Sequence, residues 1–356
     1  MRVAIIGPPY SGKTTLFQAI AEAGGSTVDV GRADQPHLAV VKVPDERLTW
    51  LTELYKPRKT VPAEIELLDM PALDLTDAAA RERWRRHWAE VRDAGLVVMV
   101  VREFDNPSVP AYRNRVDPAG DAEELRAEML FADLEQVTAR IERLEAQLRK
   151  PANRDLTQRE LELMVRLREA LEQDRPISQA VHSDAEARTL RSFAFLSHKN
   201  HLVVLNCDEQ RAGQVEAAAV AGTDALRLSA RIEEEIAQLD PVDRAAFLAD
   251  LGLTEPARDR LLRACYRKLG LITMFTVGDD ECRAWTLAEG TDAVTAAGAI
   301  HSDIARGFIR AETMTYDDLH AVGGDEKAVR AAGKLRLEGK QYVVKDGDIV
   351  HFRFNV

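Results

Sequence analysis

The chain has 356 residues, carries a formal net charge of −11 and is 46% hydrophobic. Its length suits two or three domains with sizeable cores, and no apolar run approaches the roughly 20 residues that a membrane span needs. An acidic chain repels phosphate backbones, so nucleic-acid binding would need a local basic surface. The composition therefore excludes a membrane-spanning helix and gives no support for a nucleic-acid-binding protein.

The N-terminus begins with a strand that leads into a phosphate-binding loop. Residues 2–6 form an apolar β-branched run, residues 7–14 read Gly-Pro-Pro-Tyr-Ser-Gly-Lys-Thr, and residues 15–21 have the pattern of a helix. This is a P-loop between a strand and a helix, where backbone N–H groups and the helix dipole cradle phosphates. The first strand lies so close to Met1 that it leaves no room for a secretion signal, so we expect the protein in the cytoplasm.

The residues of this loop predict a site for a nucleoside triphosphate with Mg²⁺. Gly7 and Gly12 allow unusual dihedrals, Lys13 would bridge the terminal phosphates, and the Thr14 hydroxyl would bind Mg²⁺. The full set of predicted phosphate contacts is Gly7, Ser11, Gly12, Lys13, Thr14 and Thr15. Asp69 ends an apolar strand, from which such folds present a carboxylate to the metal. The alternative role for Asp69 is a turn or helix cap.

Short apolar runs alternate with helical segments along the first 270 residues. Runs at 65–68, 96–101 and 202–205 have the length of strands. This alternation predicts an α/β fold whose mostly parallel sheet is covered by helices on both faces.

Two pairs of polar residues near later strands are candidates for binding a base. Asn206 and Glu209 follow the run at 202–205, where the amide can hold the loop and the carboxylate can read a base edge. Ser229 and Ala230 follow a short strand and either supply backbone N–H groups to the base or cap a helix.

Residues 81–88 read Arg-Glu-Arg-Trp-Arg-Arg-His-Trp and place Trp84 and Trp88 on one helix face. Basic residues interleaved with aromatic ones can contact RNA. The alternative is that both tryptophans are in the core and the arginines face solvent.

Between about 121 and 175 the sequence becomes charged and helical. Apolar residues spaced by four and three positions predict a coiled-coil seam at Leu130, Leu134, Val137, Ile141, Leu144 and Leu148. Residues 151–153 break this helix, and Thr157 with Glu160 predicts a capping box for a second one. The second helix carries Leu161, Met164, Leu167 and Leu171. The two should form an antiparallel hairpin, which either contacts a partner or is simply solvated.

The C-terminal part changes to short strands separated by Gly-Asp turns. A helix should end near Leu269, and strands are predicted over 271–277, 308–312, 340–344 and 349–354. This texture predicts a separate small α+β domain.

Several C-terminal motifs carry a family resemblance. They are Leu-Gly-Leu-Ile-Thr at 269–273, Arg-Ala-Trp-Thr at 283–286, Ala-Gly-Ala-Ile-His-Ser-Asp at 297–303, Gly-Phe-Ile-Arg-Ala-Glu at 307–312 and Asp-Gly-Asp-Ile-Val-His-Phe-Arg-Phe-Asn-Val at 346–356. With the P-loop, the Asn-x-x-Glu of 206–209 and the hairpin, the whole chain resembles the YchF-type, Obg-like ATPases of the translation-factor class of P-loop NTPases.

The resemblance implies a domain organisation. The P-loop domain would comprise 1–118 and 190–270, the helical coiled-coil insertion 119–189, and a TGS-like domain with a ubiquitin-like β-grasp fold 271–356.

The resemblance also implies a monomer that acts near ribosomes, in translation or stress response, as a weak NTPase or nucleotide-dependent switch. ATP would be preferred over GTP, because Glu209 stands where guanine-reading proteins carry Asp. Ribosome or RNA would dock on the hairpin and the tail, with candidate contacts at Lys334, Arg336, Lys340 and Lys345. The alternative function is a nucleotide-bound scaffold that joins partners without useful hydrolysis.

The sequence departs from the family in its switch regions. Ala33 stands where the family carries Thr, and Pro71 and Ala72 interrupt the Asp-x-x-Gly-Leu pattern that begins at Asp69. Leu73 is a hydrophobic residue where many related GTPases carry a water-orienting Gln, although a hydrophobic residue there is normal for this family. No catalytic residue is identified, and we expect slow hydrolysis unless the arginines of 81–86 or a partner supply the missing group.

Overall fold

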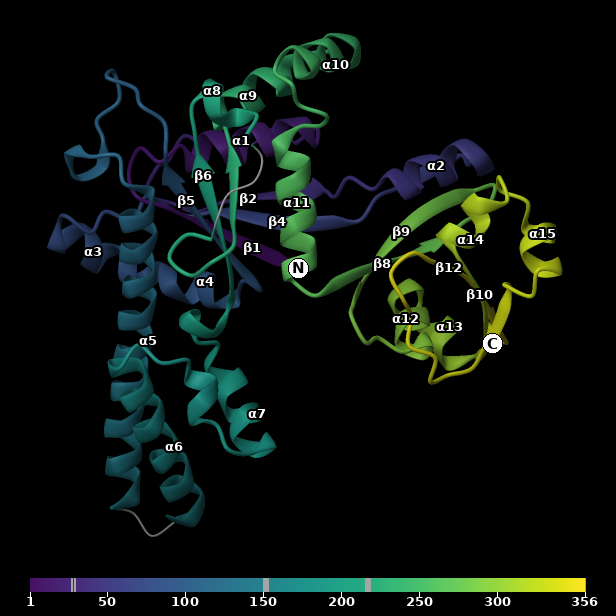
Figure 1. Cartoon of the computed structure of the whole chain (residues 1–356). Coiled ribbons are helices and arrows are strands. Elements are labelled where there is room, and N and C mark those ends of the chain that lie inside the picture. The colour runs from purple at the N-terminus through teal and green to yellow at the C-terminus, as the bar shows by residue number, and fades with distance from the viewer. Residues whose placement is uncertain (27, 29, 150–153, 215–218, 356) are drawn as a thin grey trace. The chain divides into compact units, whose positions relative to one another are not determined.

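The computed structural model describes residues 1–26, 28, 30–149, 154–214 and 219–355 (Figure 1). Contacts divide the chain into two compact units, Met1–Ala39 with Glu66–Arg258 and Val40–Ile65 with Asp259–Val356. Residues 40–65 join the second unit because β3 (Lys59–Val61) pairs in parallel with β9 (Glu281–Ala288). The three domains expected from the sequence have other boundaries, and those boundaries stay a prediction.

The first sheet has the strand order β2-β4-β1-β5-β6-β7. Its strands are β1 (Arg2–Ile6), β2 (His37–Lys42), β4 (Glu64–Asp69), β5 (Leu96–Arg102), β6 (Asn200–Asn206) and β7 (Ala225–Leu228). From β4 through β7, each neighbouring pair is parallel. The predicted α/β class with a parallel-rich sheet is confirmed. Parallel strands bring their carboxyl ends to one edge, where ligands of such sheets bind.

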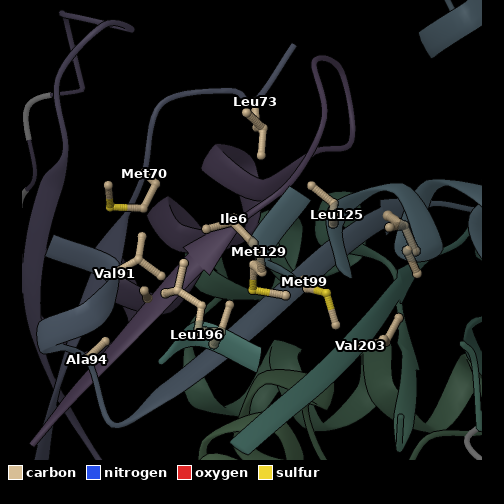
Figure 2. Packing of buried hydrophobic residues seen from close by; sticks show 14 of the residues in the cluster. Ile6, Met70, Leu73, Val91, Ala94, Met99, Leu125, Met129, Leu196 and Val203 are labelled. Carbon is tan, nitrogen blue, oxygen red and sulfur yellow. The ribbon is translucent and has the colours of Figure 1, made fainter. Parts of the chain in front are cut away.

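Helices pack on this sheet, and one buried cluster fills the space between them and one of its faces (Figure 2). The helices of the first unit are α1 (Lys13–Ala23), α3 (Ala78–Trp84), α4 (Trp88–Asp93), α5 (Pro118–Leu148), α6 (Arg154–Glu172), α7 (Asp184–Phe193), α8 (Glu209–Ala212), α9 (Ala230–Gln238) and α10 (Pro241–Asp250); α11 (Ala257–Lys268) runs from it into the second unit. Alternate strand residues such as Val97, Met99 and Val101 pack with Leu125 and Met129 of α5.

The two tryptophans of the basic segment belong to this core. Trp84 and Trp88 are only 4% and 6% exposed, and their ring centroids lie 4.5 Å apart in an edge-to-face arrangement. Buried rings cannot stack on bases, so the core role is confirmed and the RNA-stacking role is wrong.

Helices α5 and α6 form the predicted hairpin. Val137, Ile141 and Leu144 pack in one buried cluster with Met164 and Leu167. Helix α6 already begins at Arg154, so Thr157 lies inside it and the predicted capping box is wrong. The Glu160 carboxylate instead accepts two hydrogen bonds from Arg140 of α5, at 2.8 and 2.9 Å. The predicted break at 151–153 lies outside the described residues.

The second unit has a sheet of order β11-β10-β12-β8-β9-β3. Its other strands are β8 (Leu271–Thr276), β10 (Phe308–Thr315), β11 (Arg336–Glu338) and β12 (Asp348–Phe354), and its helices are α2 (Glu46–Tyr55), α12 (Ala293–Ile300), α13 (Ser302–Arg306), α14 (Tyr316–Ala321) and α15 (Glu326–Ala331). The strand predicted over 340–344 is wrong. Only residues 340 and 341 of this segment form a turn, and Val343 makes an isolated bridge with Asp292. The Tyr342 hydroxyl and the Lys345 N–H both donate to the buried Asp348 carboxylate.

Candidate nucleotide-binding site

The loop between β1 and α1 requires both of its predicted glycines. Gly12 has φ +84°, in the left-handed region that favours glycine. A Cβ on Gly12 would lie 2.1 Å from Asn206 Nδ2, and one on Gly7 would lie 2.5 Å from the Val100 carbonyl oxygen. The loop can pass this close to β5 and β6 only because these positions have no side chain.

Lys13, Thr14 and Asp69 meet at the start of α1, as the sequence predicted. Lys13 Nζ donates to Asp69 Oδ1 over 3.0 Å, and the Thr14 hydroxyl donates to Asp69 Oδ2 over 2.8 Å. The side chains of Lys13 and Asp69 are only 8% and 1% exposed. The site therefore holds a cation for phosphates and two oxygen-bearing groups of the kind that Mg²⁺ prefers.

The same loop contains a buried donor that a phosphate can satisfy. Ser11 Oγ is buried and has no hydrogen-bond partner among the described residues. Buried polar groups are normally paired, and an unpaired one marks a place for a ligand or ion. Ser11, Lys13, Thr14 and Asp69 thus fit a triphosphate with Mg²⁺.

Asn206 connects the phosphate loop with the loop after β7. Its Nδ2 donates to the Ser11 carbonyl over 2.8 Å, and its Oδ1 accepts from the Ala230 N–H over 2.9 Å. The predicted contact of the amide with the loop is present. Because the Ala230 N–H is already bonded, it is not free for a base in this structure. Ser229 Oγ accepts from the Ile232 N–H and caps α9, which is the simpler of its two predicted roles.

A cavity of about 860 Å³ adjoins the phosphate loop. Its size is in the range of small-molecule sites. Six predicted residues line it, namely Gly12, Thr15, Asn206, Glu209, Ser229 and Ala230. Its other lining residues include Phe104, Asp105, Asn106, Val109, Asp208 and Arg231. Two residues of the phosphate loop, Gly12 and Thr15, thus share one cavity with the four residues predicted to bind the base.

The sequence analysis missed Arg102, which shapes one wall of this cavity. Arg102 is 3% exposed. Its guanidinium donates to the carbonyls of Phe104, Asn106, Val109 and Pro110 at 2.9 to 3.1 Å. Burial lowers the pKa of Arg102. An arginine that directly ends a buried apolar strand was the available signal.

Asp208 was also missed, although it lies within the Asn-x-x-Glu pattern. Its carboxylate accepts from the Arg211 N–H and caps the short helix α8, which begins at Glu209. A hydrogen bond from the Arg211 guanidinium, at 2.7 Å, lowers the pKa of Asp208. Asp208 therefore positions the exposed Glu209 at the cavity.

The switch residues have no group that orients water. Leu73 is fully buried in the core cluster, and its N–H donates to the Gly7 carbonyl over 3.0 Å (Figure 2). Ala33 and Ala72 are exposed and carry only methyl groups. The Pro71 carbonyl accepts from Trp84 Nε1 over 3.0 Å, which fixes this segment to α3.

The arginines after this segment bind α5. Arg81 Nε donates to Glu128 over 2.8 Å, Arg85 bonds Glu135, and Arg92 contacts Asp133 at 2.6 Å. Glu128 raises the pKa of Arg81. Arg81 and Arg85 are therefore already paired with acidic residues of α5, the first helix of the hairpin.

The four basic residues proposed as docking contacts divide into two pairs. Lys334 Nζ lies 2.6 Å from Asp318, and Arg336 lies 3.5 Å from Glu338 and 3.8 Å from Asp348. Lys340 and Lys345 are exposed. Carboxylates thus partly neutralise Lys334 and Arg336, and the positive charge of the four residues together is weaker than the sequence predicts.

A P-loop between the first strand and helix, a carboxylate ending the neighbouring strand and a cavity beyond define a P-loop nucleotide-binding protein. Comparisons with known families support this class of protein. Residues 2–130 match a family described as "50S ribosome-binding GTPase", and residues 271–355 match the YchF GTPase C-terminal family, described as "Protein of unknown function (DUF933)".

Relatives extend over the full chain. It is 37% identical to the "Ribosome-binding ATPase YchF" of Bacillus subtilis, with all of both chains covered. It is 31% identical to "Obg-like ATPase 1" of Oryza sativa, covering all of this chain and 92% of that one. The solved "YchF GTPase" of Schizosaccharomyces pombe superposes with a TM-score of 0.83 at 28% identity, covering 99% of this chain and 97% of that one. The chain belongs to the YchF family.

None of the helices in the described ranges is long and apolar enough to cross a membrane.

Proposed function

We propose that this protein binds ATP with Mg²⁺ at the P-loop, hydrolyses it slowly and acts on the ribosome as a nucleotide-dependent switch in the cytoplasm. The observation that carries the proposal is the cluster of Lys13, Thr14 and Asp69 beneath a loop that Asn206 holds. Relatives in Bacillus subtilis and Escherichia coli O157:H7 are named ribosome-binding ATPases.

Each residue has a task in this function. Bound Mg²⁺ neutralises phosphate charge. Lys13 and the Ser11 hydroxyl donate to phosphate oxygens, while Thr14 and Asp69 hold the metal. These contacts bind the ground state, whereas rapid hydrolysis also needs a positioned water and added charge stabilisation. The buried Leu73 and the methyl group of Ala33 supply neither.

Isothermal titration calorimetry with Mg²⁺ and ATP tests the binding site. We expect micromolar affinity, about −8 kcal/mol. Lys13→Ala should weaken it at least about a hundredfold, because it removes a charge-assisted contact to phosphate. Exposed Lys42 provides a matched control as Lys42→Ala. Equal binding by the Lys13→Ala protein would show that the P-loop is not the site.

Single-turnover hydrolysis with excess protein separates the switch from the alternative function. The buried Leu73 and the exposed Ala33 favour a scaffold that holds nucleotide without useful turnover. We expect a rate below about 1 per second and similar affinities for ATP and ADP, because muted switches give little differential binding. Stimulation by added ribosomes would favour the switch, and no hydrolysis in either condition would favour the scaffold.

Cosedimentation with ribosomes at low and moderate salt tests the partner. The net charge of −11 predicts weak association that falls steeply with salt. Lys340→Glu with Lys345→Glu should reduce it further, because these two exposed side chains are the candidate contacts. Failure to comigrate in every nucleotide state would contradict the ribosomal role.

A further inference from the structure

His37 is a largely buried histidine beside Asp69, one of the residues predicted to hold the metal. It is the first residue of β2, and its side chain is 11% exposed. Its Nδ1 is buried and has no hydrogen-bond partner within the described ranges. Nδ1 lies 3.7 Å from Asp69 Oδ2, which is beyond hydrogen-bond distance. This buried nitrogen therefore lacks a hydrogen bond, and it lies beside the residues that fit a triphosphate with a divalent cation.

The Asp69 carboxylate brings His37 to the groups predicted to hold the metal. Asp69 Oδ2 accepts from the Thr14 hydroxyl over 2.8 Å and also faces His37 Nδ1. Its other oxygen bonds Lys13. The His37 imidazole nitrogen, the Thr14 hydroxyl and the Lys13 ammonium thus converge at the Asp69 carboxylate.

The chemistry of these donors bears on which divalent cation the site accepts. Mg²⁺ prefers oxygen ligands and keeps several waters. Imidazole suits transition metals, and a site that adds one nitrogen to oxygen ligands favours them over Mg²⁺. A lone pair on Nδ1 would bond such a cation directly, whereas with hydrated Mg²⁺ it would accept a hydrogen bond from a metal-bound water and make no bond to the metal.

We propose that His37 is an imidazole ligand of the divalent cation bound with the nucleotide, and that its nitrogen raises the affinity of this site for Mn²⁺ relative to Mg²⁺. This rests on the proposed nucleotide site. His37 could instead only pack in the core, or only orient Asp69. In either role its nitrogen would make no bond to the metal.

Pulsed electron paramagnetic resonance on the full chain with Mn²⁺ and ADP tests the assignment. Coupling of Mn²⁺ to phosphorus-31 reports the bound phosphates, and coupling to nitrogen reports the imidazole. We expect both in the natural protein, and labelling its histidines with nitrogen-15 must change the nitrogen signal. His37→Asn should lose the nitrogen coupling, keep the phosphorus coupling and lower the Mn²⁺ over Mg²⁺ affinity ratio about tenfold. Exposed His301, as His301→Asn, is the control that should keep both signals.

The spectrum of the natural protein decides the proposal even if the variant folds poorly. Phosphorus coupling without histidine nitrogen coupling would overturn the role of His37 and leave the nucleotide site intact. Absence of phosphorus coupling as well would overturn the nucleotide site, and the His37 proposal with it.

Discussion

The phosphate end and the base end of the nucleotide site are built in different ways. At the phosphate end, Lys13 and Thr14 follow β1, and Asp69 ends β4, the strand beside it. At the base end, the cavity wall depends on Arg102 and Asp208, which act through loop backbone and a short helix. The phosphate end is a compact motif, whereas the base end is built by the loops that follow three different strands. Substitutions should therefore separate the two ends when ATP and inorganic tripolyphosphate are compared as ligands.

The largest effect is expected where the two ends meet. Gly12→Ala would place a Cβ 2.1 Å from Asn206 Nδ2 at a φ of +84°. The loop or the Asn206 side chain must therefore move, and we expect this movement to disrupt the bond from Asn206 to the Ser11 carbonyl. We expect binding of ATP and tripolyphosphate to fall together, at least about a hundredfold, from the strain and the lost buried bond. Competition against a fluorescent nucleotide measures both, and Gly25→Ala, with no atom near its Cβ, is the control. Loss of ATP binding alone would contradict the shared loop.

Arg102→Ala should affect only the base end. It removes the donor to four partly buried loop carbonyls, and an acceptor left unpaired costs about 1–3 kcal/mol wherever water cannot replace the donor. We expect ATP to bind about tenfold more weakly, from disorder of the cavity wall, and tripolyphosphate to bind unchanged. Arg102→Lys keeps the charge without the planar set of donors and should restore little. Equal loss of both ligands would show that Arg102 supports the whole domain instead.

Glu209→Asp tests base choice. Removing one methylene moves the carboxylate away from the cavity, and we expect the preference for ATP over GTP to shrink by up to about tenfold, with tripolyphosphate unaffected. Competition between the two nucleotides for the fluorescent analogue is the measurement. A tenfold preference of the natural protein for GTP would reverse the assignment of Glu209.

The smallest effect is expected for Asp208→Asn. Asparagine still caps α8, so the main loss is the ion pair with Arg211, worth less than about 1 kcal/mol at a partly exposed site. Because Arg211 lowers the pKa of Asp208, this stability is present above the unfolded pKa, about 3.9, and is lost as pH falls through the folded value. The difference in Tm from the natural protein should be present at pH 7 and shrink as the pH falls below about 3.9. Asp240→Asn, at the cap of α10, is the control, and a difference independent of pH would contradict the ion pair.

What could be predicted from the sequence follows the same division. Apolar runs were enough to predict parallel strands, because a strand that is buried on both faces is recognised by the apolar character of its own residues. Gly12, Lys13 and Thr14 could be assigned to a phosphate loop from the sequence because a contiguous loop supplies their backbone geometry. Arg102 could not be assigned, since its carbonyl partners follow from how its loop folds. The strand predicted over 340–344 was wrong for a similar reason: its alternating side chains suit a strand, but Val343 makes only an isolated bridge and the Tyr342 hydroxyl bonds the buried carboxylate of Asp348.

The attachment of the switch segment to α5 has a mechanical consequence. Pro71 is bonded to Trp84, and Arg81 and Arg92 of the same stretch are paired with the near half of α5. This helix is 31 residues long, which corresponds to about 46 Å at 1.5 Å per residue. Turning it by about 5° at its base would carry its far end through about 4 Å, by simple geometry on that length. A displacement too small to rearrange the phosphate site would thus move the far end of α5 by about the length of a side chain.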